Sequence, residues 1–370
     1  MFPVFCIAFL TAFLFSAVSC WLVRRLAVDW GFVDKPGERK IHTQPIPTGG
    51  GLGIGIGVLI PFAFFQLFLF LLFHFDAFRF LFPTAITIHL DGMWYRSGQL
   101  WTLLGLGSLL LILGTLDDRF NLNWRLRLGV QLFVAIITVC CGWRLTAFID
   151  APILTNILSV IWIVGLINSF NMLDNMDGLS AGTAAICGLF LAAVMFLSPN
   201  PASHQPQFFV AGFLLILVGA VAGFLVYNNP FRASMFMGNG GAYFIGFLLS
   251  AVTLTATFSG YGGAVAAQTV FVPLLILAVP IYDTTTVVLI RIRNGKSPFI
   301  GDKNHFSHRL VDLGFSKTQA VLMVYLTTTI CCFGSLLMYQ VNFIGASLIF
   351  LQTFLVLLLI GIIEYVGRKN

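Results

Sequence analysis

The chain has 370 residues, of which 58% are hydrophobic and only 9% are charged, and its mean hydropathy is +0.95. Soluble domains carry roughly 25% charged residues, so this composition excludes a soluble protein and predicts an integral membrane protein. The net charge of +6 does not require nucleic acid as a partner, because the cations follow the two sides of a membrane.

Apolar runs of about 20 residues predict helices that cross a membrane. The chain contains eleven such runs, and no hydrophilic stretch between them is long enough to fold by itself. The expected spans are residues 2–23, 50–73, 99–116, 128–143, 153–173, 179–198, 208–227, 241–259, 268–290, 318–339 and 343–366. Residues 1–370 are therefore predicted to form one all-α, polytopic membrane domain.

The positive charges predict the orientation of these spans. If the N-terminus lies outside, 17 of the 20 lysines and arginines fall on cytoplasmic segments, and only Arg79, Arg96 and Arg144 fall outside. We therefore expect an outside N-terminus and a cytoplasmic C-terminus. Most acidic residues also fall on the cytoplasmic side, where the positive-inside rule does not demand them, and this clustering predicts a polar site there.

The first polar stretch, residues 34–51, combines cations with prolines and ends in a glycine run that opens an apolar helix. Lys40 and His42 lie within it. Basic side chains together with free backbone N–H groups favour the binding of an anion such as phosphate. A basic loop that only follows the topology rule is the alternative interpretation.

Two adjacent acids, Asp117 and Asp118, end the third apolar run and are followed by Arg119, Arg125 and Arg127. Adjacent acids cannot share one face within a helix, but at a helix end both can serve one site. One can hold a metal ion while the other orients a phosphate or accepts its proton. A solvated acidic turn is the alternative.

A row of polar residues follows the fifth apolar run. Asn168, Asn171 and Asp174 are spaced three residues apart, so they fall near one face if the helix continues, and Asp177 extends the row into a turn. Polar groups at this depth are costly unless they line a cavity or hold a ligand, and oxygen-rich clusters suit Mg²⁺ and the phosphates it carries. A polar loop with a helix cap at Asp177 is the alternative.

A fourth stretch, residues 228–241, contains Asn228 and Asn239 and ends in a glycine-rich turn before an apolar run. Such a turn favours a backbone cradle for an anion.

In the fifth stretch His305 and His308 lie three residues apart between Lys303 and Arg309. Cations beside imidazoles suit phosphate or carboxylate recognition. A zinc site would need a third ligand, and none of a suitable type lies nearby.

Together the five stretches resemble the polyprenyl-phosphate N-acetylhexosamine-1-phosphate transferase family, of the glycosyltransferase family 4 type. That family includes initiators of O-antigen and of the teichoic-acid linkage and the phospho-N-acetylmuramoyl-pentapeptide transferase. The resemblance extends from Asp34 to about Gly314. The matching residues are Asp117 and Asp118; Asn168, Asn171, Asp174, Asp177 and Gly178; Asn228 and Pro230; Phe236 to Asn239; and His305 to His308.

The chain departs from the family pattern at two places. Where the family has an acid that is thought to hold the metal, this chain has Asn239. Its histidine loop matches neither the His-His-x-x-Glu of the muropeptide enzyme nor the full His-x-His-His of the O-antigen initiator. With Lys40, His42 and eleven spans, the chain looks closer to the undecaprenyl-phosphate GlcNAc-1-phosphate transferase branch.

The resemblance implies transfer of an N-acetylhexosamine 1-phosphate, most of all GlcNAc 1-phosphate, from a UDP-sugar to polyprenyl phosphate such as undecaprenyl phosphate. UMP leaves, and a cell-envelope polysaccharide is initiated. The implied cofactor is Mg²⁺, with Mn²⁺ as the alternative. The implied location is the inner membrane, with the active site on the cytoplasmic face. The two substrates and the bilayer are the expected partners, nucleic acid is not, and a homodimer is left open.

Roles for individual residues are carried over from the same resemblance. The implied catalytic residues are Asp117, Asp118, Asp174 and Asp177, and the implied metal ligands are Asp118, Asp177 and Asn239. The implied substrate contacts are Lys40, His42, Arg127, Asn168, Asn171, Asn228, His305, His308 and Arg309. Asp117 or Asp118 is expected to orient or deprotonate the attacking phosphate, and the sequence does not decide between them.

Three other functions are weighed against this one. A muropeptide transferase is disfavoured by the histidine loop. A transporter is disfavoured because it needs polar groups near the middle of several spans, whereas the polar groups here crowd one interface. A homologue that binds the lipid or nucleotide without turnover is kept open by Asn239.

Overall fold

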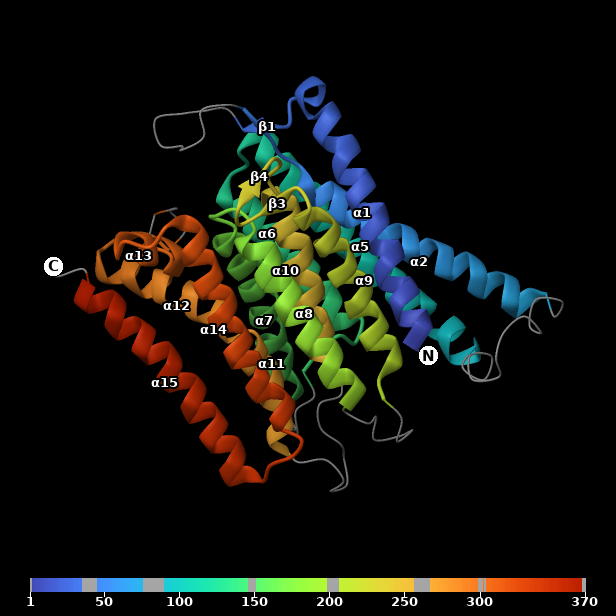
Figure 1. Ribbon diagram of the computed structural model, residues 1–370. Coiled ribbons are helices and arrows are strands. Elements are labelled where there is room, and N and C mark those ends of the chain that lie inside the picture. Colours follow the sequence, from blue (N-terminus) through green and yellow to red (C-terminus); the bar gives the residue numbers. More distant parts are fainter. Residues whose placement is uncertain are drawn as a thin grey trace.

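The computed structural model describes residues 2–34, 45–75, 90–145, 151–197, 206–255, 267–298, 302 and 304–367. Most of these residues form a bundle of long helices (Figure 1). The long helices are α1 (Phe2–Trp30), α2 (Gly50–His74), α5 (Leu90–Phe120), α6 (Trp124–Cys140), α7 (Pro152–Leu173), α8 (Leu179–Leu197), α9 (Phe208–Leu225), α10 (Gly238–Thr255), α12 (Ala278–Arg293), α14 (Lys317–Leu337) and α15 (Phe343–Gly367).

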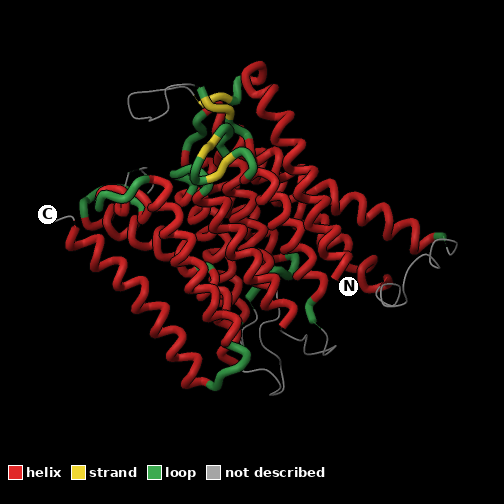
Figure 2. Tube along the Cα trace, viewed as in Figure 1, coloured by secondary structure: helices red, strands yellow, loops and turns green. Residues whose placement is uncertain are grey.

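The remaining elements are short. They are the 3-10 helix η1 (Ala267–Phe271), α11 (Val272–Ile276) and α13 (Phe306–Asp312), with the strands β1 (Val33–Asp34), β2 (Ile46–Pro47), β3 (Asn228–Asn229) and β4 (Arg232–Ala233). β1 pairs antiparallel with β2, and β3 pairs antiparallel with β4. Both ribbons lie at the same end of the bundle, which is the upper end in Figure 2 and is called the polar end below.

Each of the eleven predicted spans overlaps a helix, so the expectation of an all-α polytopic membrane protein is confirmed. Within the described residues, eight helices are long and apolar enough to cross a membrane, or nine if the bent pair formed by η1–α11 and α12 is one span. The other two predicted spans form α6, which has 17 residues, and α10, which is a shorter apolar helix. The count of eleven spans stays a prediction.

The bend of 67° between α11 and α12 has a local cause. Pro280 lies in the first turn of α12 and has no backbone N–H, so the carbonyl of Ile276 lacks its usual helical donor. The buried thiols of Cys187 and Cys332 lie 3.2 and 3.6 Å from this oxygen and donate to it. These two cysteines therefore serve packing and capping.

α10 occupies the centre of the bundle and packs against α5, α7 and α2 (Figure 1). At the polar end these helices approach through glycine. A Cβ at Gly114 of α5 would lie 2.4 Å from the backbone nitrogen of Gly240, and a Cβ at Gly51 of α2 would lie 2.2 Å from that of Gly241. Backbone contact of this kind is typical of tightly packed membrane helices, and it fixes the first turn of α10 between its neighbours.

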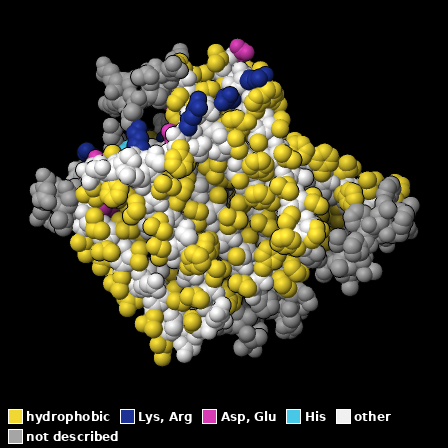
Figure 3. Space-filling view, in the orientation of Figure 1, with side chains coloured by type: hydrophobic (Ala, Val, Ile, Leu, Met, Phe, Trp, Pro, Cys, Tyr) yellow, Lys and Arg dark blue, Asp and Glu magenta, His cyan; other side chains and the backbone are white. Residues whose placement is uncertain are grey.

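The surface agrees with a membrane location. In the face seen in Figure 3, hydrophobic side chains cover the flanks of the bundle, and charged side chains gather toward the polar end. α15 contributes to the apolar surface with large exposed side chains such as Phe354, Leu355 and Leu359. Such a surface is stable in lipid and would aggregate in water.

Cysteine labelling tests the predicted orientation. In a chain whose native cysteines have been replaced, a cysteine at Ser97, near the start of α5, should react with a membrane-impermeant thiol reagent in intact cells. A cysteine at Ser297, just after α12, should react only after permeabilisation. The reverse labelling pattern would contradict the orientation and would place the polar end outside the cell.

Candidate functional site

The predicted site residues that the structure describes come from helix ends and turns at the polar end. Asp117 and Asp118 lie in the last turn of α5, Asn171 in the last turn of α7, and Asn239 in the first turn of α10. Their separation in sequence reaches 122 residues, yet they form one network of hydrogen bonds. Helix packing therefore brings three of the five polar stretches together.

Asn239 is the centre of this network. Its Nδ2 donates to Asp117 Oδ2 at 2.8 Å, and its Oδ1 accepts from Asn171 Nδ2 at 2.6 Å. Its backbone N–H donates to Asp118 Oδ1 at 3.0 Å. One residue thus joins both aspartates of α5 to the polar row of α7. Oδ1 is the only atom of this side chain suited to bind a metal ion, and it already accepts a hydrogen bond.

Asp117 is held by protein groups on all sides. It is 3% exposed, and besides Asn239 its carboxylate accepts from Arg127 Nη1 at 2.6 Å and from the backbone N–H of Leu122 at 2.9 Å. Leu122 and Arg127 belong to the connection between α5 and α6 and to the first turn of α6. The ion pair therefore fixes this connection, and Arg127 is directed at Asp117.

Asp118 is half-buried and lies against the first turn of α10. Gly238 has φ of +78°, and a Cβ at this position would lie 2.3 Å from Asp118 Oδ2, so only glycine leaves room for the carboxylate. The peptide dipoles at a helix N-terminus stabilise a negative charge. The cradle that the sequence predicted for a ligand anion at this turn thus holds a carboxylate of the protein itself.

The glycine run at the start of α2 was also expected to offer free N–H groups to phosphate. The N–H groups of Gly50 and Gly51 instead donate to the carbonyls of Phe236 and Met237, each at 2.9 Å. These bonds join the start of α2 to the segment before α10. That expectation is therefore wrong for Gly50 and Gly51. Lys40 and His42, the candidate phosphate contacts of this stretch, lie outside the described residues.

The polar row after α7 is divided between helix and turn. α7 ends at Leu173, so Asp174 caps the helix and Asp177 lies exposed in the turn that follows. Burial, and then the carboxylates of Asp118 and Asp177, raise the pKa of Asp174 to about 8. The three acids therefore repel one another, and a bound cation would relieve that repulsion.

Two asparagines of the site contact other protein groups. Asn168 Nδ2 donates to Gln131 Oε1 at 2.7 Å, which joins α7 to α6. Asn228, which is 4% exposed, accepts from the backbone N–H of Gly178 at 2.7 Å and donates to the carbonyl of Met235 at 2.8 Å. Asn228 therefore clamps the turn that carries Asp177 onto the segment before α10, and its geometry favours a positioning role.

The histidine loop is tied to the same turn. Ser307 Oγ donates to Asn175 Oδ1 at 2.6 Å, and Asn175 lies between Asp174 and Asp177. His305 and His308 have ring centroids 6.4 Å apart, with His305 buried and His308 half-buried. The fifth polar stretch is therefore joined through Ser307 to the turn that carries Asp174 and Asp177.

Asp283 is a residue of this region that the sequence reasoning did not select. It is fully buried in α12, and its Oδ2 lies 2.9 Å from His305 Nδ1 while its Oδ1 accepts from the backbone N–H of Phe306 at 2.6 Å. A carboxylate inside an apolar span was the signal that could have identified it. The pair orients the imidazole and directs its other nitrogen, Nε2, away from Asp283.

Arg309 was expected to hold a phosphate or sugar group. In the structure its Nε forms an ion pair with Glu364 Oε2 at 2.9 Å, its Nη2 donates to Thr286 Oγ1 at 3.2 Å, and its Nη1 donates to the carbonyl of Asn304. The guanidinium is 3% exposed and joins α13 to α12 and α15. This geometry favours a structural role for Arg309.

Within the described residues, no group of three His, Cys, Asp or Glu side chains is arranged to hold a metal ion on its own. Mg²⁺ commonly uses one or two carboxylates and completes its coordination with water and substrate phosphates. One or two of the acids Asp118, Asp174 and Asp177 fit such a site, because burial first, and then the other two carboxylates, raise the pKa of Asp174 and so favour a cation beside it.

Replacing Asn239 by Asp tests the charge balance of the network. An aspartate would place a carboxylate oxygen where an amide nitrogen now donates to Asp117, and two buried carboxylates repel unless a proton or cation lies between them. With chelator present, the melting temperature of Asn239→Asp should fall by about 3 °C or more, and Mg²⁺ should restore much of it.

Asn239→Ala is the matched control, because it removes the hydrogen bonds of the side chain without adding a charge. Its melting temperature should fall to the same extent with and without Mg²⁺. A response of Asn239→Asp to Mg²⁺ no larger than that of Asn239→Ala would show that residue 239 does not lie beside a cation site.

Comparison with known proteins shows which family and which relatives this chain resembles. Residues 100–257 match the glycosyl transferase family 4 model, and this range includes the network around Asn239. The chain is 30% identical over 98% of its length to the probable undecaprenyl-phosphate N-acetylglucosaminyl 1-phosphate transferase of Bacillus subtilis, and it covers 91% of that protein.

Two further relatives carry related names. The decaprenyl-phosphate N-acetylglucosaminephosphotransferase of Mycolicibacterium smegmatis is 30% identical over 88% of this chain and 80% of its own length. The undecaprenyl-phosphate alpha-N-acetylglucosaminyl 1-phosphate transferase of Escherichia coli K12 is 26% identical over 87% of this chain and 80% of its own length. Likeness to these proteins over nearly the whole length shows that this chain belongs to glycosyl transferase family 4, among the polyprenyl-phosphate N-acetylhexosamine-1-phosphate transferases.

Proposed function

We propose that this protein transfers N-acetylglucosamine 1-phosphate from a UDP-sugar to a polyprenyl phosphate, releases UMP and so initiates a cell-envelope polysaccharide. The names of the relatives support the sugar and the lipid acceptor. The observation that carries the proposal is the convergence of Asp117, Asp118 and Asn171 on Asn239 at the polar end of an apolar bundle. There a lipid phosphate and a water-soluble nucleotide can meet.

The reaction exchanges one phosphoryl bond for another. An oxygen of the polyprenyl phosphate attacks the phosphorus that carries the sugar, and the bond from that phosphorus to the bridging oxygen breaks. UMP leaves with the bridging oxygen. Because the lipid phosphate carries its negative charge at the membrane interface, we place the active site at the cytoplasmic face of the inner membrane.

The geometry favours different roles for the two aspartates of α5, Asp117 and Asp118. Asp117 already accepts three hydrogen bonds, from Asn239, Arg127 and Leu122, so it holds the site together. Asp118 has one oxygen bonded to the N–H of Asn239 and is less buried, so it is the better candidate to orient the attacking phosphate or to accept its remaining proton.

Asp118 and Asp177 are the proposed ligands of Mg²⁺, or of Mn²⁺ as the alternative, with Asp174 beside them. Mg²⁺ bound there would neutralise the diphosphate and stabilise the charge on departing UMP. Asn239 Oδ1, which accepts one hydrogen bond from Asn171, could join them through its second lone pair. His305, held by Asp283, and His308 are the proposed contacts to phosphate or sugar oxygens.

A second function is favoured by one observation. Asn239 is neutral and is bonded to its neighbours, so the site carries one negative charge fewer than the family pattern. A protein with this site could bind the lipid phosphate or the nucleotide without turnover.

Release of UMP from the purified protein tests the proposal. With UDP-N-acetylglucosamine and undecaprenyl phosphate in detergent, UMP should appear and should depend on added Mg²⁺. Asp118→Asn and Asp177→Asn should lower the rate by roughly 10²-fold or more, because each removes a charge proposed to serve the metal or the nucleophile.

Asp29→Asn is the matched control, since Asp29 is an exposed acid near the end of α1. It should leave the rate unchanged. Lack of UMP release with this sugar nucleotide, together with retained binding of undecaprenyl phosphate, would favour the binding-only function. Near-normal rates in both site variants would contradict the assigned roles.

The Asp283–His305 pair gives a separate prediction. Asp283→Asn keeps an oxygen that can accept from Phe306 but replaces the other oxygen with a donor, which forces the opposite tautomer on His305. UMP release should fall about 10- to 100-fold. The pH dependence of UMP release should also change. The control Ser307→Ala, which leaves the pair between Asp283 and His305 intact, should have a smaller effect on the rate. A loss of melting temperature without a loss of rate would show that the pair only stabilises the fold.

A further inference from the structure

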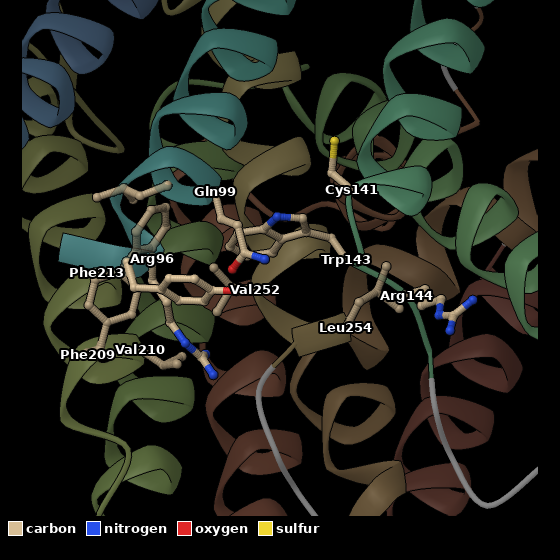
Figure 4. Close-up of a pocket in the computed structure, with 13 residues that line it drawn as sticks. Arg96, Gln99, Cys141, Trp143, Arg144, Phe209, Val210, Phe213, Val252 and Leu254 are labelled. Carbon is tan, nitrogen blue, oxygen red and sulfur yellow. The ribbon is translucent and has the colours of Figure 1, made fainter. Parts of the chain in front are cut away.

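A cavity of about 350 Å³ lies at the end of the bundle opposite the polar end (Figure 4). It is formed by the start of α5, the turn after α6, the start of α9 and the end of α10. Its lining includes Arg96, Gln99, Trp143, Arg144, Phe213 and Val252.

This cavity is separate from the candidate active site. α5, α6 and α10 contribute to both, but at opposite ends. Arg96 and Asp117 are 21 positions apart on α5, and a rise of 1.5 Å per residue places them about 30 Å from one another. A ligand in this cavity would therefore not contact the residues assigned to catalysis, and the inference does not depend on the proposed reaction.

The polar lining of the cavity is basic. Arg96 and Arg144 line it, and no acidic side chain is among the residues that do so. Figure 4 shows Gln99 and Trp143 between these two arginines. Within the described part of the chain, neither guanidinium forms an ion pair or a hydrogen bond. Two cationic side chains without such a partner among the described residues thus border one hollow.

The placement of these arginines is unusual for this chain. With the predicted orientation, only three of its 20 lysines and arginines lie outside, and two of the three border this cavity. Basic residues are disfavoured on the outer side of a membrane protein. Their presence on two sides of one hollow therefore points to recognition of an anion.

The walls of the cavity are apolar and aromatic. Phe213 and Val252 are each 3% exposed, and Trp143 lies beside the polar groups. A small soluble anion gains nothing from such walls, whereas a phospholipid can place its phosphate at the arginines and its acyl chains along the apolar side. Arginine and tryptophan are typical of membrane interfaces for this reason.

We propose that this cavity binds the headgroup of an anionic phospholipid, with its phosphate at Arg96 and Arg144. Gln99 can donate to phosphate or glycerol oxygens. Trp143 packs beside the glycerol region, and Phe213 and Val252 contact the upper part of an acyl chain. A phosphate group is the chemistry recognised, so a free phosphate ion is the other source that the test must separate.

The test uses the full-length protein, delipidated in a neutral detergent. Its melting temperature is measured with phosphatidylglycerol, phosphatidylcholine or inorganic phosphate at constant ionic strength, and native mass spectrometry counts the lipids retained. Phosphatidylglycerol should raise the melting temperature by about 3 °C or more, and the two other additives should raise it by less than a third of that.

The double variant Arg96→Gln with Arg144→Gln should lose most of this response and retain one phosphatidylglycerol fewer. The matched control, Arg232→Gln with Arg293→Gln, removes the same charge from exposed positions outside this cavity and should respond like the parent protein. If the double variant does not purify, Arg96→Gln and Arg144→Gln are compared one at a time, and each should weaken the response.

Three outcomes would overturn the proposal. Equal stabilisation by phosphatidylglycerol and phosphatidylcholine would show that the headgroup charge is not recognised. A full response in the Arg96 and Arg144 variants would place the lipid elsewhere. Full stabilisation by inorganic phosphate alone would show a site for a small anion, to which the apolar walls contribute nothing.

Discussion

The hydrogen bonds of the Asn239 carboxamide are the constraint on which the polar end depends. Asp117 is buried, and a buried polar group in a membrane protein must find its partners within the protein, because lipid offers none. From the first turn of α10, Asn239 donates to Asp117 and accepts from Asn171. It therefore provides a hydrogen-bond partner to a side chain of α5 and to a side chain of α7. The close glycine contacts of α10 with α2 and α5 make this possible, because they bring the helix ends near enough for short side chains to meet.

A neutral residue at this centre changes the electrostatics of the site. The amide nitrogen of Asn239 supplies a partial positive charge to Asp117, which also receives the full charge of Arg127. Asp117 is therefore compensated by protein groups. Asp174, with its pKa raised to about 8, is not compensated in the same way. The place where a cation gains most lies toward Asp118, Asp174 and Asp177, away from Asp117.

Buried ion pairs organise the histidine loop next to this centre. Asp283 orients His305, and Arg309 pairs with Glu364 near the end of α15. Burying an isolated charge is costly, so each pair makes its loop or helix end dependent on its partner. The pair with Glu364 anchors α15, a helix with few other contacts to the bundle (Figure 1). The geometry around the active site is thereby linked to the packing of the last helix.

The sequence by itself determined the class of the protein and the location of its polar stretches. Hydropathy is a local property, so eleven apolar runs were enough to predict an all-α membrane bundle. The unequal distribution of lysine and arginine between the two sides was enough to predict its orientation. The spacing of Asn168, Asn171, Asp174 and Asp177, with the adjacent Asp117 and Asp118, was enough to suggest the family. The expectation that Asp174 shares a helix face with Asn168 and Asn171 required the helix to continue, and α7 ends at Leu173.

Only the tertiary structure decided which polar groups meet. The contact between Asn239 and Asp117 joins residues 122 positions apart, and no local pattern encodes such a distance. For the same reason the sequence could not show that Asn228 forms hydrogen bonds with backbone groups or that Arg309 forms an ion pair with Glu364. It could name the polar residues near the interface. Their division into groups that hold the fold and groups that can face a substrate depends on how the helices pack, since a hydrogen bond requires atoms about 3 Å apart.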